Sequence, residues 1–284
     1  MPIAGCRLPT FHTDDAVRRA LKEDLGDAGD ITTAACIPAS ARSKAVIAAR
    51  APGVIAGIDL ALAAFRLVDP AIGVAVEQGD GARVAKGGVV LRLEGPSRGI
   101  LTAERVALNF LGHLSGVATA TAALVEAVKG TKAKIVCTRK TTPGHRAFEK
   151  HAVKCGGGFN HRFGLYDAMM IKDNHIVAAG GLEKALAAAR GAAGHLVKIE
   201  IEVDSLAGLE EALAAGAQVV LLDNMSVNDM KKAVALNKGR AVLEASGNVT
   251  LATVRAIAET GVDVISSGWI THSAPNLDLG LDFL

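Results

Sequence analysis

The sequence predicts an α/β protein in which an incomplete parallel β/α barrel of the TIM type follows an N-terminal α+β sandwich domain. Three observations support this fold class. In the second half of the chain, strand-type segments alternate with helical segments. Three of these strands carry acidic residues, Glu202, Asp223 and Glu244, separated by 21 residues each time. The first hundred residues instead mix short strands with glycine-rich turns. A repeated unit of one strand and one helix is what a parallel barrel requires.

The N-terminal domain is expected to cover residues 1–110. Residues 53–69 and 74–95 combine short apolar runs with glycine-rich turns, and a long helical stretch begins at Thr102. This mixture indicates a separate α+β domain before the barrel. The C-terminal segment, residues 273–284, is expected to pack back on this domain.

The barrel is expected to cover residues 111–272. Residues 197–204 alternate strictly between apolar and charged side chains, which predicts a strand. The pattern continues with helices over 205–216, 226–239 and 249–261, and with strands over 217–225, 240–248 and 262–268. Two earlier strands, 133–140 and 167–175, carry basic residues near their ends. Since the carboxyl ends of barrel strands share one mouth, these cations and the three acids are expected to converge there.

Positive charge is concentrated in one window of a nearly neutral chain. The whole sequence has a net charge of +2, but residues 138–175 contain seven Lys/Arg against three acids, and four of the eight histidines. This concentration indicates an anionic small ligand, and the alternative is a solvated helix face. Nucleic acid is not expected as a partner, because only 3% of the residues are aromatic.

The remaining composition indicates a cytoplasmic protein without a membrane partner. No uninterrupted apolar run approaches the roughly 18 residues that span a bilayer, and the N-terminus lacks the apolar core of a signal peptide. The cysteines, at positions 6, 36, 137 and 155, show no CxxC pairing. Their spacing therefore predicts neither a disulfide framework nor a structural zinc site, and we expect them to be reduced.

Known nucleotide-binding motifs are absent from the sequence. There is no GxxxxGK[ST] loop, and the glycines of CGGGFNHR do not have dinucleotide-fingerprint spacing. No residue is singled out as a Ser-His-Asp nucleophile. Ser-Gly pairs do follow two predicted strands, at Ser246–Gly247 and Ser267–Gly268. Backbone amides at such positions suit a phosphate group.

Several collinear motifs between about residue 20 and residue 275 resemble the quinolinate phosphoribosyltransferase family. They are EDLGDAGDITT, ERVALNFLGHLSGVAT, TRKTTPGHRAFEKHAVKCGGGFNHRFGLYDAMMIKDNH, IEIEVD, LLDNM, LEASGN and ISSGWITHS. A molybdate-associated paralogous family shares part of this frame, but it resembles the segment IKDNH less. The resemblance implies phosphoribosyl transfer from 5-phosphoribosyl 1-pyrophosphate to quinolinate, with decarboxylation to nicotinate mononucleotide.

The resemblance also implies which residues bind the two substrates. Guanidinium forks suit the two adjacent carboxylates of quinolinate, for which the matching residues are Arg105, Arg139, His161, Arg162 and Lys172. Glu202 and Asp223 match an acidic pair that would hold Mg²⁺ and act in catalysis with Lys140. Glu244 is less clearly assigned. The matching positions for phosphoribosyl pyrophosphate are Lys140, Lys172, Ser246, Gly247, Asn248, Ser267, Gly268 and His272.

The family resemblance further implies a homodimer with a composite active site. Arg105 lies early in a helix that precedes the barrel strands, and the resemblance implies that it serves the neighbouring subunit. The rival hypothesis is a non-catalytic protein that binds phosphate or an oxyanion on the same barrel. The carboxylates Glu202 and Asp223 argue against this rival, because an anion binder gains nothing from them.

Overall fold

The computed structural model describes residues 8–284 of the chain, so that Cys6 lies outside the described residues. These residues form two compact units. The first unit contains the chain up to Ala122 together with residues 147–157 and 273–284, and the second contains residues 123–146 and 158–272. The first unit extends past residue 110 because helix α4, Ser97–Ala127, runs without a break through that position.

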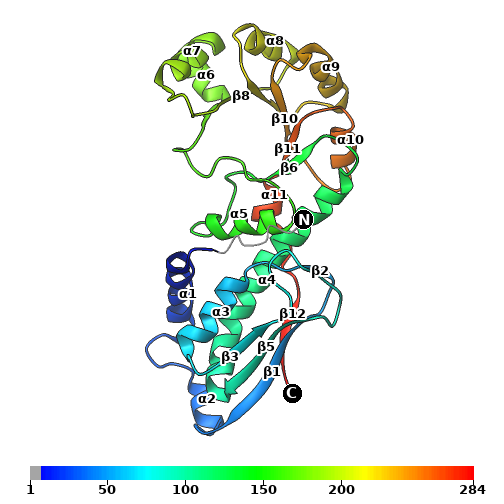
Figure 1. Ribbon diagram of the computed structural model, residues 1–284. Coiled ribbons are helices and arrows are strands. Elements are labelled where there is room, and N and C mark those ends of the chain that lie inside the picture. Colours follow the sequence, from blue (N-terminus) through cyan, green and yellow to red (C-terminus); the bar gives the residue numbers. More distant parts are fainter. Residues whose placement is uncertain (1–7) are drawn as a thin grey trace. The chain divides into compact units, whose positions relative to one another are not determined.

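The first unit is built on an antiparallel sheet with the strand order β12-β1-β5-β3 (Figure 1). A second, two-stranded sheet pairs β2 with β4, and helix α1 packs against α3. The strands are β1 (Arg42–Ala49), β2 (Gly53–Val54), β3 (Gly73–Val76), β4 (Arg83–Val84), β5 (Val89–Pro96) and β12 (Leu279–Phe283). The helices are α1 (Thr10–Leu25), α2 (Ile31–Cys36), α3 (Ile58–Val68), most of α4 and most of α5 (Arg146–Cys155).

The C-terminal segment belongs to this first unit. Strand β12 pairs antiparallel with β1, with Ala45 opposite Phe283. Residues before this strand lie directly on helix α4, since a Cβ atom added to Gly116 would lie only 2.2 Å from the carbonyl oxygen of Pro275. Glycine at 116 therefore allows the C-terminal chain to approach the helix backbone.

The second unit contains a six-stranded parallel sheet with the order β6-β11-β10-β9-β8-β7. The strands β6 and β7 are its two edges, so the barrel is incomplete, as predicted. The strands are β6 (Lys134–Val136), β7 (Met169–Ile171), β8 (Ile199–Val203), β9 (Val219–Asp223), β10 (Val242–Ser246) and β11 (Val264–Ser266).

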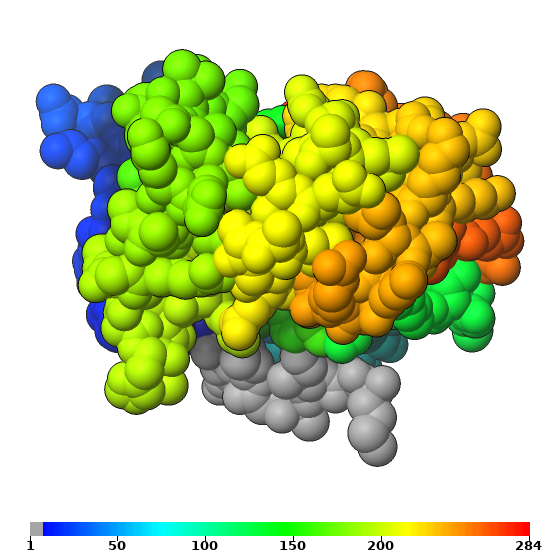
Figure 2. Space-filling model, turned by 90° about the horizontal axis from the view of Figure 1, so that it is seen from above, coloured from blue at the N-terminus to red at the C-terminus, as the bar shows by residue number. Residues whose placement is uncertain are grey.

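Helices follow the strands of this sheet in the predicted alternation. They are α6 (Asp173–Ala179), α7 (Leu182–Ala192), α8 (Leu206–Ala214), α9 (Val227–Asn237), α10 (Val254–Ala258) and α11 (Trp269–His272). In Figure 2, the part of the chain that carries these helices is coloured from yellow-green through yellow to orange and lies at the surface of the visible face. Helix α10 begins later than the predicted residue 249. Thr253 Oγ1 accepts a hydrogen bond from the Thr250 backbone N–H and so stabilises a turn in place of the first helical residues.

We expected no segment that could span a membrane, but helix α4 meets the criteria of length and hydropathy for one. It is long and apolar enough to cross a bilayer by length and composition alone, although polar residues interrupt its apolar run. Within its most apolar window, 72% of the residues are buried inside the protein. This burial is typical of a core helix, whose apolar side chains are covered by other protein segments.

Candidate active site

The candidate site lies at the carboxyl ends of the parallel strands in the second unit. The predicted acidic residues do not sit at equal heights there, although their spacing is constant. Asp223 is the last residue of β9 and pairs with Ser246, whereas Glu202 and Glu244 both pair with Leu221, two residues earlier in β9. The prediction of three comparable strand ends is therefore wrong, because only Asp223 is the last residue of its strand, and Glu244 is only 4% exposed.

Two adjoining cavities open at this end of the sheet and share part of their lining. The larger has a volume of about 610 Å³, and its lining includes Lys140, Asp223, Ser246, Gly247, Asn248, Ser267, Gly268 and His272. The smaller has a volume of about 490 Å³, and its lining includes Arg139, Lys140, His161, Arg162, Lys172, Glu202, Asp223 and Glu244. Lys140 and Asp223 line both cavities and so mark where two bound molecules could meet.

The smaller cavity presents crowded positive charge. Burial, together with the nearby guanidinium of Arg139, lowers the pKa of Arg162 below its ordinary value. The buried Nε atom of Arg139 has no hydrogen-bond partner among the described residues. An anion that accepted hydrogen bonds from both guanidinium groups would satisfy this donor and relieve the repulsion between the two charges.

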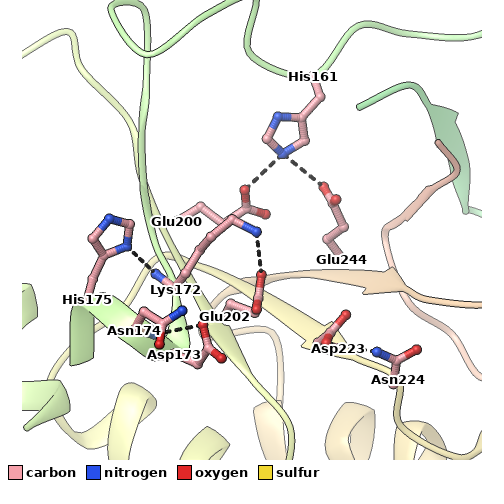
Figure 3. Close-up of polar contacts among 10 residues, drawn as sticks. All are labelled: His161, Lys172, Asp173, Asn174, His175, Glu200, Glu202, Asp223, Asn224 and Glu244. Atoms are coloured by element: carbon pink, nitrogen blue, oxygen red, sulfur yellow. Dashed lines mark hydrogen bonds and ion pairs between the residues drawn. The ribbon is translucent and has the colours of Figure 1, made fainter. Parts of the chain in front are cut away.

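His161 and the buried Glu244 line the smaller cavity, and His161 also contacts the buried Glu200 (Figure 3). His161 Nε2 lies 2.9 Å from Glu200 Oε2 and 3.8 Å from Glu244 Oε2. Burial, followed by repulsion from the Glu200 carboxylate, raises the pKa of Glu244 to about 7. A large fraction of Glu244 is therefore protonated near neutral pH, so the pair of carboxyl groups carries less than its full negative charge.

The hydrogen bonds of His161 assign the tautomer of its ring. The backbone N–H of Arg162 donates to Nδ1 over 2.8 Å, which makes Nδ1 an acceptor. The ring proton is then on Nε2 and is donated to Glu200. Both ring nitrogens thus bind the protein, and they connect the buried Glu200 to the backbone of Arg162.

Glu202 and Asp223 provide oxygen ligands in the smaller cavity. Lys172 Nζ lies 3.4 Å from Glu202 Oε2, and the Asn224 side-chain amide donates to Asp223 Oδ2 over 2.9 Å (Figure 3). Both carboxylates are hard donors, and a Mg²⁺ ion that keeps several of its waters needs only one or two of them. The two residues therefore fit a magnesium ion held jointly with an anionic substrate.

Close backbone approaches shape the larger cavity. Gly247 has φ +101°, and a Cβ atom added there would lie 2.1 Å from Asn224 Oδ1. At Gly268, an added Cβ would lie 2.8 Å from Cδ of Lys140. The Thr271 hydroxyl donates to the carbonyl oxygen of Lys140 over 2.7 Å and so fixes the backbone that carries this lysine. The two glycines keep the Ser-Gly loops open to a ligand beside the Lys140 amine.

The structure brings together every predicted site residue of the second unit. Arg105 instead lies on α4 in the first unit, where it is exposed, and its role stays a prediction. Sequence reasoning missed Glu200, Asn224 and Thr138. Glu200 could have been noticed, because a residue two before Glu202 in a strand lies on the same face. Asn224 and Thr138 carry no comparable sequence signal.

Comparisons with known proteins connect this site to one family. Residues 30–115 match the family described as "Quinolinate phosphoribosyl transferase, N-terminal domain", and residues 117–282 match its C-terminal domain. The chain is 48% identical to a nicotinate-nucleotide pyrophosphorylase [carboxylating] from Mycobacterium leprae, over 94% of this chain and 96% of that protein. It is 43% identical to a probable enzyme of the same name from Bacillus subtilis, over 92% and 89%.

Solved structures give the same result for the fold. The nicotinate-nucleotide pyrophosphorylase from Francisella tularensis is 40% identical, with a TM-score of 0.94 and 98% of each chain covered. The enzyme of that name from Pyrococcus furiosus is only 18% identical, with a TM-score of 0.71 over 99% of this chain and 78% of that chain, and shows a shared fold alone.

Proposed function

The chain belongs to the quinolinate phosphoribosyltransferase family, and on this premise we propose that it makes nicotinate mononucleotide. The substrates are quinolinate and 5-phosphoribosyl 1-pyrophosphate, and the other products are pyrophosphate and CO₂. The observation that carries this proposal is the pair of adjoining cavities that share Lys140 and Asp223. One cavity is lined by guanidinium groups that suit two carboxylates, and the other by Ser-Gly loops that suit a phosphate.

We assign quinolinate to the smaller cavity. Arg139 and Arg162 would each bind a carboxylate through a planar fork, and the Lys172 ammonium would add a third positive charge. His161 supports this site through the backbone of Arg162, because both of its ring nitrogens are engaged by the protein. Binding a dianion here would return the Arg162 guanidinium to a favourable electrostatic environment.

We assign phosphoribosyl pyrophosphate to the larger cavity. Its 5-phosphate would accept hydrogen bonds from the loops at Ser246–Asn248 and Ser267–Gly268, near His272. Lys140 would then face the pyrophosphate, at the border between the two cavities. Glu202 and Asp223 would hold Mg²⁺, which supplies neutralisation of pyrophosphate charge when bound.

The reaction requires no nucleophile from the protein. The lone pair of the quinolinate nitrogen forms a bond to the anomeric carbon of ribose, and the bond from that carbon to pyrophosphate breaks with its electron pair on the leaving oxygen. The positively charged ring nitrogen then stabilises the carbanion left when the adjacent carboxylate departs as CO₂, and this carbon takes up a proton.

The protein's main contribution is to hold two anionic substrates together and in line. Positioning of this kind contributes on the order of 7 to 11 kcal/mol. The cations Arg139, Lys140 and Arg162 offset the repulsion between the substrates. On this assignment Asp223 would lie near the anomeric carbon, and its carboxylate would stabilise the positive charge that develops there.

We further propose that the active unit is a homodimer in which Arg105 completes the quinolinate site of the neighbouring subunit. This assignment rests on the match of the "ER" motif to the family. Cytoplasmic location stays a prediction from the sequence. The rival function is a non-catalytic oxyanion-binding protein or a molybdate-associated paralogue, and the pair Glu202 and Asp223 favours catalysis over both.

A single assay tests the proposed function. The purified protein is incubated with quinolinate, phosphoribosyl pyrophosphate and Mg²⁺, and nicotinate mononucleotide and CO₂ are measured. We expect both products in equal amounts, and little product when nicotinate, which lacks the second carboxylate, replaces quinolinate. Binding of both substrates without product would favour the non-catalytic rival, and equal use of nicotinate would contradict the two-carboxylate site.

A further inference from the structure

A second group of side chains that could hold a metal ion belongs to the first unit, and none of its members has been assigned a part in the reaction. His151 and Cys155 are one turn apart on helix α5, and Asp80 comes from the loop between β3 and β4. His151 Nε2 lies 2.7 Å from Asp80 Oδ2 and 3.4 Å from Cys155 Sγ. The three ligand atoms all lie within 4.8 Å of one another. The ligand atoms of a carboxylate, an imidazole and a thiol are therefore close enough together to bind one metal ion.

The separations of these atoms fit a tetrahedral zinc ion. Zinc bonds of about 2.0–2.1 Å to nitrogen and about 2.3 Å to sulfur place the two ligand atoms roughly 3.6 Å apart at a tetrahedral angle. The observed distance from His151 Nε2 to Cys155 Sγ, 3.4 Å, is close to this value. The distance of 2.7 Å from His151 Nε2 to Asp80 Oδ2 is that of a hydrogen bond, and it would have to lengthen by about 0.6–0.7 Å on metal binding.

The carboxylate of Asp80 is already oriented for this role. Its Oδ1 atom accepts a hydrogen bond from the Ile58 backbone N–H over 3.0 Å, which directs Oδ2 to His151. Such supporting hydrogen bonds hold ligands in place at zinc sites. The side chains of His151 and Asp80 are 10% and 20% exposed, so an ion would lose most of its water but could still enter from solvent.

The composition of the site selects the kind of ion. A thiolate and an imidazole are soft and intermediate ligands that suit zinc, whereas magnesium prefers oxygen ligands and keeps its waters. The Mg²⁺ of the proposed reaction would therefore not compete here. Three protein ligands leave the fourth zinc position to water.

We propose that Asp80, His151 and Cys155 form a zinc site that fastens helix α5 to the loop before β4. The proposal does not depend on the proposed function, because all three residues belong to the first unit and none has been assigned a part in the reaction. Zinc binding deprotonates the Cys155 thiol and displaces the His151 proton from Nε2, so the affinity should fall as the pH is lowered.

Cobalt(II), which takes the place of zinc in such sites, provides a readout that is independent of activity. The full-length protein is treated with a chelator, freed of it, and titrated with Co²⁺ while the near-ultraviolet thiolate-to-cobalt absorption band is recorded. Zn²⁺ affinity is then measured by calorimetry. We expect one ion per chain, with the thiolate band present.

Variants distinguish this site from other ligands in the chain. Cys155→Ser should abolish the thiolate band and weaken Zn²⁺ binding at least about tenfold, and Asp80→Asn should weaken binding comparably. Cys36→Ser, which removes an exposed thiol on α2, should change neither measurement. Circular dichroism verifies that each variant is folded. If Cys155→Ser does not fold, His151→Asn removes a different ligand and takes its place in the test.

Two outcomes would overturn the proposal. One is the absence of a thiolate band or of Zn²⁺ binding, which would leave the three side chains as a hydrogen-bonded chain only. The other is binding that Cys155→Ser leaves unchanged and His161→Asn removes, which would place the ion at the His161, Glu200 and Glu244 group in the second unit.

Discussion

His161 Nε2 lies 2.9 Å from Glu200 Oε2, and this contact joins the smaller cavity to a pair of buried carboxyl groups. Because the Arg162 backbone donates to the other ring nitrogen, the orientation of the ring is determined from both sides. The backbone of Arg162 is therefore connected through His161 to the two buried glutamates.

Arg139→Ala should weaken quinolinate binding by about 30-fold or more, equivalent to about 2 kcal/mol, because it removes a partly buried guanidinium from an anion. Arg139→Lys retains the charge but loses the planar fork, so its affinity for quinolinate should lie between that of Arg139→Ala and that of the unchanged protein. Calorimetric titration with quinolinate measures both. An unchanged affinity in Arg139→Ala would show that this residue does not bind quinolinate.

Asp223→Asn should lower kcat far more than it lowers quinolinate affinity. The carboxylate is assigned to the metal and to the charge that develops on the ribose, and the loss of such a group costs on the order of a hundredfold in kcat. Steady-state kinetics and calorimetry on the same preparation separate the two effects. A selective loss of quinolinate affinity would contradict the assignment.

Glu244→Gln should alter how stability depends on pH. Since burial raises the pKa of Glu244 to about 7, the folded state binds more protons than the unfolded state between the ordinary value of 4.5 and about 7. Its stabilising contribution is complete below pH 4.5 and is lost as the pH rises through about 7. The unchanged protein should therefore lose on the order of 1–3 kcal/mol relative to Glu244→Gln between about pH 5 and pH 8.

Urea denaturation at several pH values measures this difference for Glu244. Glu210→Gln, at an exposed position on α8, is the matched control and should follow the unchanged protein at every pH. A constant difference between Glu244→Gln and the unchanged protein across this range would mean that Glu244 is not protonated on folding.

Gly247→Ala should impair phosphoribosyl pyrophosphate binding, with a rise in its KM of at least about tenfold, because the new methyl group would collide with Asn224 Oδ1. Gly239→Ala is the matched control. Gly239 also has positive φ, +75°, but an added Cβ there would meet nothing within 4 Å. If both variants raise the KM equally, backbone strain rather than the collision is responsible.

Mixing Arg105→Ala with Lys140→Ala tests the composite dimer. In a mixed dimer, the site that retains Lys140 receives a normal Arg105 from its partner, while the other site lacks both. With random subunit exchange, about a quarter of the normal activity should return. Verified exchange without recovered activity would place Arg105 in its own subunit's site or outside the site.

The local pattern of the sequence was sufficient to predict the alternating strands and helices of the second unit. Strict alternation over residues 197–204 predicts β8, because successive side chains of a strand point to opposite faces. The Ser-Gly pairs at 246 and 267 were likewise readable, because they directly follow apolar strand segments. The motifs also identified the family, and so the substrates and the basic residues of the smaller cavity.

Only the tertiary structure decided how deep each side chain lies and which distant residues meet. Asp223 and Glu244 are as far apart in the sequence as Glu202 and Asp223, but the first ends its strand while the second is buried with Glu200 and His161. The height of a side chain along the sheet follows from the hydrogen-bonded register between strands, and its burial follows from the segments packed around it; no local spacing specifies either. For the same reason, no spacing of cysteines indicated that Asp80 would meet Cys155 through His151.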